Sequence, residues 1–327
     1  MSEFVKGTQR LVNPIDVGSM HFIQWLNRML PKPIQDALVK SSGKKYPYMG
    51  FVVEPYSYFM FYEITDLDMA QSLLPDGFKP IKTKIFDTDE PKYYVIFGCF
   101  RAHTSAFWGA RIEFYVVAED QQTGLLTWVI VDYDSDTISH DPKRGLYSPN
   151  CVGGVMTTDY DGTLTVDFKR NDNSRQLVFE GDLTKGTQRE LDQRLWLEGN
   201  LSVCHGKELS NGKADVFSLR FEPEEVEQAL DMPLDSLQMQ TNSWYPGLFA
   251  KEPSAVVCFP YAQHFVSDSP GHASNIKNRD ELIAANKSLD FNKIELFSTE
   301  SFKVIMFAGT IFSFAISTIL LLLLIFT

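Results

Sequence analysis

The chain has 327 residues, enough for one large domain or two average ones. It carries 30 Lys and Arg against 42 Asp and Glu, and the resulting charge of −12 repels the phosphate backbone of nucleic acids. Hydrophobic residues make up 44% and aromatic residues 13%, which is far more than a disordered chain contains. These values predict a folded protein with a sizeable core that does not bind nucleic acid.

The residues near the N-terminus predict an amphipathic helix at 19–30, which places Phe22, Trp25 and Leu26 along one apolar side. Such a helix can lie in a membrane interface, where a tryptophan suits the headgroup boundary. The alternative is a helix that packs on the folded domain. The preceding residues contain no apolar stretch followed by a small-residue cleavage site, so we expect no secretory signal peptide.

Residues 46–266 are dominated by a period of two, which is typical of β-strands. One helix is expected at 66–74, capped by Thr65 or Asp66 and ended by Pro75-Asp76-Gly77, and a shorter one at 223–230. Short turns at 161–162 and 171–174 predict antiparallel hairpins. Strands are expected at 51–64, 93–100, 112–117, 125–131, 152–159, 163–170, 176–181, 191–203, 216–221 and 254–265.

These patterns predict an α+β, β-dominated fold: a large antiparallel curved sheet, or a closed β-cone or barrel, with few helices. We expect four parts along the chain. They are an N-terminal segment at 1–45, a β-rich domain at 46–266, a polar connector with a short amphipathic helix at 267–302, and a C-terminal helix at 303–327.

The C-terminal helix carries no charged side chain from Val304 to Phe326. At about 1.5 Å per residue it would be roughly 35 Å long, enough to cross a hydrocarbon layer about 30 Å thick. Only Thr327 follows, while several lysines and arginines precede the span. The sequence therefore predicts a single-pass, tail-anchored membrane protein whose body lies in the cytoplasm and whose partner is the lipid bilayer.

Small residues recur every four positions within this span, at Gly309, Ser313 and Ser317. They fall along one helical face, where another backbone could approach closely. We expect another membrane protein or a second copy of the chain to contact this face. The alternative is chance, because small residues are common in membrane helices.

The sequence gives little support for a metal site. The cysteines Cys99, Cys151, Cys204 and Cys258 form no CxxC pair, and we expect buried, reduced thiols. Asp132, Asp134 and Asp136 alternate and could hold a calcium ion, but Thr137 and Lys143 occupy the glycine and glutamate positions of the calcium-loop pattern. A strand end turning into solvent explains them better. We expect no metal ion and no cofactor.

One stretch of the β-rich domain resembles the acetoacetate decarboxylase-like superfamily. A predicted helix leads into Leu74-Pro75-Asp76-Gly77-Phe78, a Gly-aromatic strand pair surrounds Trp108-Gly109, and Pro142-Lys143-Arg144 is similar to the family's Pro-Lys-Lys segment. The resemblance would cover about two thirds of the chain. It implies a large curved β-structure and, if activity is kept, an imine-forming Lys143 beside the cation Arg144, with Glu113 as the carboxylate.

The reaction motif departs from the family pattern, because Ile138-Ser139-His140-Asp141 replaces the expected aromatic-Gly context and Glu113 is only a loose counterpart. Two functions remain open. The favoured one is a membrane-anchored, non-catalytic binding or interaction module, a subunit or auxiliary of a membrane assembly. The alternative is a decarboxylase or aldolase-type enzyme that acts through a lysine imine on a small or lipid-derived keto compound. A small hydrophobic or keto ligand fits both functions.

Overall fold

The computed structural model describes most of the chain, from the N-terminal helix to the C-terminal helix. The described residues are 1–12, 31, 33, 49–104, 108–137, 139–141, 145–147, 149–151, 153–210, 215–267, 275–292 and 299–326. The predicted helix at 19–30, with Phe22, Trp25 and Leu26, lies outside these residues, so its interfacial role stays a prediction.

A 14-stranded sheet forms the body of the protein, built around the long strands β5, β6 and β7. Its main path runs in the order β13 (Thr187–Glu190), β17 (Gln228–Met232), β19 (Ala255–Phe259), β2 (Ser57–Glu63), β5 (Lys92–Thr104), β6 (Trp108–Asp120), β7 (Leu126–Ser135), β14 (Val203–His205) and β15 (Asp215–Phe217). Short strands off this path are β1 (Met49–Val53), β3 (Phe78–Pro80), β4 (Lys82–Thr83), β16 (Leu219–Arg220) and β20 (Gln263–Ser267).

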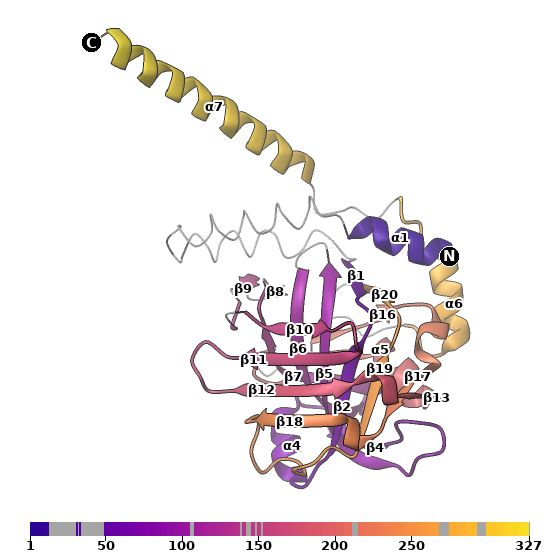
Figure 1. The fold of residues 1–327 in the computed structure, drawn as a ribbon. Helices are drawn as coiled ribbons and strands as arrows, with labels where there is room; N and C mark the ends of the chain where they lie inside the picture. Colours follow the sequence, from indigo (N-terminus) through magenta and orange to yellow (C-terminus); the bar gives the residue numbers. More distant parts are fainter. Residues whose placement is uncertain are drawn as a thin grey trace.

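A second sheet of four strands lies across β5, β6 and β7 on one face of the main sheet (Figure 1). Its order is β10 (Val155–Thr158), β11 (Thr163–Lys169), β12 (Gln176–Asp182) and β18 (Leu237–Asn242), and all its pairs are antiparallel. A two-stranded ribbon joins β8 (Ser139–Asp141) to β9 (Gly145–Tyr147).

Helices are short in this body. They are α1 (Glu3–Leu11), α4 (Leu67–Leu73), α5 (Gly199–Leu201), α6 (Arg279–Ser288), the 3₁₀ turns η1 (Leu183–Lys185), η3 (Pro223–Val226) and η4 (Leu234–Ser236), and the π-helix η2 (Arg194–Glu198). Helix α4 begins as predicted, because the Asp66 carboxylate accepts a hydrogen bond from the N–H of Met69 at 2.8 Å.

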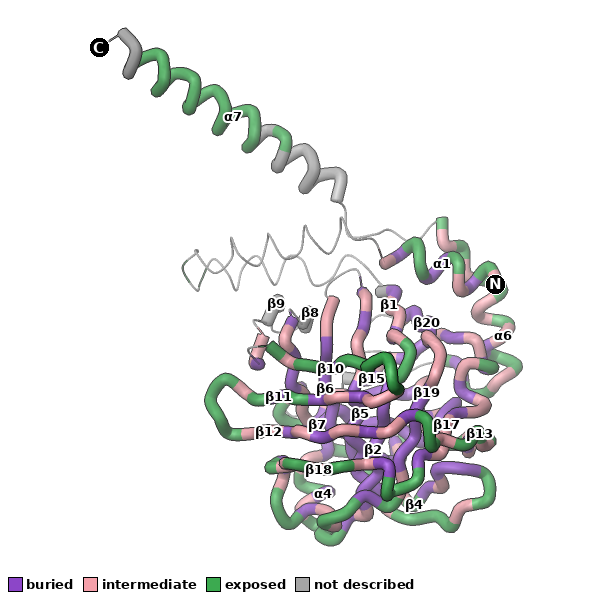
Figure 2. Tube along the Cα trace, viewed as in Figure 1, coloured by how far each residue is buried: buried purple, intermediate pink, exposed green. Residues whose placement is uncertain are grey.

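The two faces of the main sheet form two separate hydrophobic cores. On β6, Phe114 and Val116 point to the core between the two sheets, whereas Tyr115 and Val117 point to the opposite core, which contains Trp196. This alternation is the period of two that the sequence displays. Figure 2 shows that the strands are most deeply buried where the two sheets overlap. All four cysteines are buried and free, as predicted.

The β-dominated class is confirmed, but the closed barrel is wrong. The main sheet is open: its path ends at β13 and at β15, which do not pair with each other in the described part of the chain. It is not purely antiparallel either, since Val203 of β14 pairs with Trp128 of β7 in a parallel ladder. The physical reason is the preceding segment, which turns through η2 and α5 instead of forming the strand predicted at 191–203.

The C-terminal helix α7 (Thr299–Phe326) extends away from the body (Figure 1). Across the described ranges, no helix is long and apolar enough to cross a membrane. We therefore correct the predicted membrane anchor, together with the single-pass location and cytoplasmic body that rested on it.

The small residues Gly309, Ser313 and Ser317 are exposed on α7, and a Cβ added at Gly309 would meet no atom within 4 Å. The helix–helix contact through this face stays a prediction. The connector before α7 contacts the N-terminal helix α1, because the Phe4 and Phe291 rings meet edge to face at 5.7 Å.

Candidate functional site

Strand β6 places Arg111, Glu113 and Tyr115 on one face of the main sheet, since every second residue points to the same side. The Glu113 carboxylate accepts hydrogen bonds from Arg111 Nε through one oxygen and from the Tyr115 hydroxyl through the other. Three polar side chains on consecutive positions of one face therefore form a continuous hydrogen-bonded row.

Neighbouring strands close around this row. Gly98 on β5 and Tyr133 on β7 lie directly opposite Glu113. A side chain at position 98 would find little room, because an added Cβ would lie 2.9 Å from the Phe59 ring and 3.1 Å from the Tyr115 ring. The Arg111 guanidinium carbon lies 4.0 Å from the centre of the Tyr133 ring, a cation–π contact.

We call Arg111, Glu113, Tyr115 and Tyr133 the Glu113 cluster. Its charged pair is largely removed from water, with Arg111 6% and Glu113 9% exposed. Burial raises the pKa of the Tyr115 phenol well above its usual range, and the charge of Glu113 adds to this effect. Tyr115 therefore keeps its proton near neutral pH and acts as a hydrogen-bond donor to Glu113.

Chemically, the cluster combines a carboxylate that can accept a proton or a hydrogen bond with a guanidinium that matches carboxylate and carbonyl oxygens. The surrounding core is aromatic: Trp128 lies 5.1 Å from Tyr115 and 5.3 Å from Trp196, ring centre to ring centre. Such surroundings strengthen polar interactions because they exclude water.

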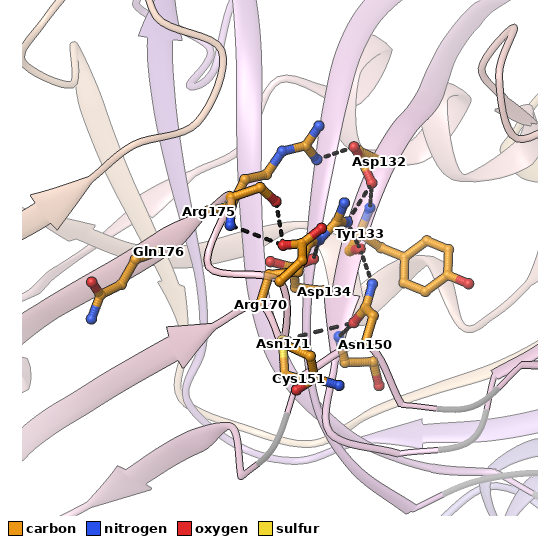
Figure 3. Close-up of polar contacts among 12 residues, drawn as sticks. Asp132, Tyr133, Asp134, Asn150, Cys151, Arg170, Asn171, Arg175 and Gln176 are labelled. Atoms are coloured by element: carbon orange, nitrogen blue, oxygen red, sulfur yellow. Dashed lines mark hydrogen bonds and ion pairs between the residues drawn. The ribbon is translucent and has the colours of Figure 1, made fainter.

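A second set of charges lies on the opposite face of β7 and joins the two sheets (Figure 3). Asp132 and Asp134 on β7 meet Arg170 and Arg175, which flank the turn between β11 and β12. We call these four residues the Asp–Arg cluster. Arg170 Nε lies 2.7 Å from Asp134 and its Nη2 lies 3.0 Å from Asp132, while Arg175 pairs with the other oxygen of Asp132. The Tyr245 hydroxyl also donates to Asp132, at 3.0 Å.

The Asp–Arg cluster corrects the interpretation of 132–136 as a strand end turning into solvent. Asp134 is fully buried, and Asp136 accepts a hydrogen bond from the N–H of Ala110 at 3.0 Å. Arg170 and Arg175 already pair with the carboxylates of Asp132 and Asp134, so few carboxylate oxygens remain to bind a metal ion. Among the described residues, no group of three His, Cys, Asp or Glu side chains is arranged to hold a metal ion.

Tyr133 lies between the two clusters on β7. Its ring belongs to the Glu113 cluster, while its backbone oxygen accepts hydrogen bonds from Arg170 Nη2 at 3.0 Å and from Asn150 Nδ2 at 2.8 Å. Arg111 and Arg170 therefore contact β7 at Tyr133 from its two opposite faces.

Of the site residues predicted from the sequence, Glu113 lies in the cluster, whereas Lys143 and Arg144 lie outside the described residues. The lysines that the structure describes are all exposed or half-buried, so none has the apolar surroundings that favour a free amine. Sequence reasoning missed Arg111 and Tyr115, although their spacing of two residues from Glu113 on a predicted strand was the signal that could have found them.

Comparisons with known proteins found a similarity to a solved structure only. No protein-family model and no curated protein matches the chain. Among solved structures, the fold is similar to the crystal structure of acetoacetate decarboxylase from Legionella pneumophila, with 16% identity and a TM-score of 0.44 over 68% of this chain and 85% of that one. The resemblance to the acetoacetate decarboxylase-like group expected from the sequence has a counterpart in this similarity, which is weak and concerns the fold alone.

Proposed function

We propose that the chain is a β-rich binding protein whose ligand is a small, partly apolar molecule with a keto or carboxylate group, bound at the Glu113 cluster. The observation that carries this proposal is the buried pair of Arg111 and Glu113 in an aromatic core. The membrane attachment expected from the sequence is not part of the proposal.

The energetic argument starts from the cost of burying charge. Removing two ions from water costs several kcal/mol per ion, and apolar side chains of similar size often stabilise a core as well or better. Strongly paired charges in a core are therefore frequently functional. Here the guanidinium fits an oxygen-rich ligand group, and the aromatic side chains around it fit an apolar one.

We expect Glu113→Gln to weaken ligand binding by about 10- to 100-fold, because the Glu113 carboxylate holds the two donors Arg111 and Tyr115 in place and a neutral amide pairs less well with the guanidinium. The introduced glutamine keeps the size of the side chain and one acceptor oxygen, so the fold should persist. The probes are 3-oxo carboxylates of increasing chain length, and calorimetry measures their affinity. Glu119→Gln on the same strand is the matched control, since Glu119 pairs with Arg194 at the partly exposed end of β6.

Two results would contradict the proposal: affinity that is equal in Glu113→Gln and in the wild type, or the absence of binding by every probe to the wild-type chain. Urea unfolding of both variants separates a loss of affinity from a loss of the folded state.

A lysine-imine enzyme is the alternative, and Lys143 is its candidate nucleophile. Imine formation needs a free amine, and borohydride reduces an imine to a stable adduct. For a non-catalytic binding protein we expect incubation with a small 3-oxo acid and borohydride to label Lys143 no more than exposed lysines such as Lys251. Peptide mass mapping measures the labelling. Selective labelling of Lys143 that disappears in Lys143→Ala would establish the enzyme instead.

A further inference from the structure

Tyr133 is the member of the Glu113 cluster that lies nearest to solvent. Arg111, Glu113 and Tyr115 are buried, whereas Tyr133 is half-buried. Its ring lies over the Arg111 guanidinium, with 4.0 Å between the guanidinium carbon and the ring centre. Figure 3 shows that the ring points away from the charged residues of the Asp–Arg cluster. A ligand that approaches the guanidinium from this side therefore meets the tyrosine ring first.

Aromatic packing closes two other sides of the cluster. Toward β5, the Phe59 and Tyr115 rings lie so close to Gly98 that they would crowd even an added Cβ. Along β6, Tyr115 packs against the buried Trp128 ring. Among these neighbours in the described part of the chain, Tyr133 has the most exposed side chain, so its side is the most open approach to the charged pair.

The backbone of Tyr133 is held in place on both edges of β7. On one edge, β6 pairs with the strand along its length. On the other edge, β14 pairs with β7 only as far as Ile130, where the N–H of Gly206 bonds to the Ile130 oxygen. Beyond this point the Asn150 amide takes the place of a strand: its Nδ2 donates to the Tyr133 oxygen at 2.8 Å, and its Oδ1 accepts from the Ser135 N–H at 2.7 Å. The ring therefore moves by rotation of its side chain, while the backbone stays fixed.

We infer that the Tyr133 ring is the gate of the ligand site at the Glu113 cluster, an inference that rests on the proposed function. In the closed position the ring pairs with the Arg111 guanidinium. A ligand carboxylate or carbonyl reaches the guanidinium once the ring has rotated away. The cation–π contact keeps most molecules closed, and a site that is open in only a fraction of the molecules binds its ligand more weakly by that fraction.

Chemical modification of arginine in the full chain tests the gate without any ligand. Phenylglyoxal, a small dicarbonyl reagent, reacts with guanidinium groups that it can reach. We expect Tyr133→Ala to raise the rate of Arg111 modification by about 5- to 30-fold, the inverse of the open fraction that a partly desolvated cation–π contact allows. Peptide mass mapping measures the rate at each arginine.

Two further variants and an internal control separate the ring from other effects. Tyr133→Phe restores the ring and should return the rate to the wild-type value. Tyr133→Leu is a milder change for the fold and should also raise the rate, because leucine has no π face. Arg279 is the internal control, since its side chain is 39% exposed and should react equally in every variant. An equal increase at Arg279 overturns the inference, because the whole fold would then have loosened.

Stopped-flow binding of 3-oxo carboxylates connects the gate to ligand entry. Tyr133→Ala should increase the association rate constant by a similar factor, about 5- to 30-fold, whereas Tyr160→Ala truncates a 98% exposed tyrosine and should leave it unchanged. Wild-type rates of Arg111 modification in both Tyr133→Ala and Tyr133→Leu overturn the gate, whether or not the probes bind. If Arg111 becomes reactive as expected but no probe binds to the wild type or to Tyr133→Ala, the ring covers Arg111 as inferred and it is the proposed function that fails.

Discussion

Arg170→Ala should lower the free energy of unfolding by about 3–5 kcal/mol, the loss expected when one partner of a buried ion pair is removed. Arg170 is the main partner of Asp134, which is fully buried and lies 2.7 Å from Arg170 Nε. The second oxygen of Asp134 has no hydrogen-bond partner among the described residues. Without Arg170 the carboxylate would be buried and unpaired.

Urea unfolding measures this loss, and Arg279→Ala is the matched control. Arg279 also pairs with two carboxylates, those of Glu224 and Glu227, but its side chain is 39% exposed. Removing it should cost at most about 1 kcal/mol, because water screens exposed pairs. Similar losses in the two variants would show that the Asp–Arg cluster does not hold the sheets together.

The pH dependence of the Arg170→Ala effect follows from Asp134. Burial raises the pKa of this carboxyl, and the charge of Arg170 opposes the rise. Without Arg170 the folded-state pKa should therefore rise further. A carboxyl with a raised pKa favours folding most below its unfolded pKa and loses this contribution as the pH rises through the folded pKa. The difference between variant and wild type should thus narrow as the pH falls from neutral toward about 4.

The Asp–Arg cluster also shows what a single sequence could not reveal. The alternation of Asp132, Asp134 and Asp136 was visible, but their partners lie on another sheet, at Arg170 and Arg175. That contact depends on how β11 and β12 dock on β7, which no local pattern encodes. The turn between β11 and β12 was predicted from residues 171–174, and in it Asn173 adopts a φ of 61°, a conformation that asparagine tolerates.

The Glu113 cluster was partly predictable, because three of its residues lie close together in the sequence. Arg111, Glu113 and Tyr115 are two residues apart on one strand, so local periodicity places them on one face. What the sequence did not reveal is that this face is packed with aromatic rings. Burial makes this row of polar residues a charged pair removed from water, and burial depends on tertiary packing that the strand pattern does not encode.

For the segment at 194–201, the sequence pattern gave a wrong prediction. Leu191, Leu195, Leu197, Leu201 and Val203 all occupy odd positions, which predicted a strand. The chain instead forms η2 and α5, and the consecutive residues 195–197 are all buried. A strand would point the middle one to the opposite face. The middle one is Trp196, so the helical turn lets the largest side chain join its neighbours in the core.

Trp196→Ala should therefore lower the free energy of unfolding by about 3–5 kcal/mol, the range for truncating a large buried aromatic side chain. Trp196 is 1% exposed, and its ring lies within 5.7 Å, centre to centre, of four aromatic rings: Phe59, Phe61, Trp128 and Phe259. Its indole N–H also donates a hydrogen bond to the Ile85 oxygen at 2.9 Å.

Two further variants separate these contributions in urea unfolding. Trp196→Phe keeps most of the ring packing and removes one of two hydrogen bonds to the Ile85 oxygen, which still accepts from the N–H of Asp192 at 3.1 Å, so its loss should be smaller, about 1–2 kcal/mol. Tyr160→Ala is the surface control, because Tyr160 is 98% exposed, and its effect should stay within about 0.5 kcal/mol. If Trp196→Ala were no more destabilising than Tyr160→Ala, the aromatic contacts of Trp196 would not stabilise the core on this face of the main sheet.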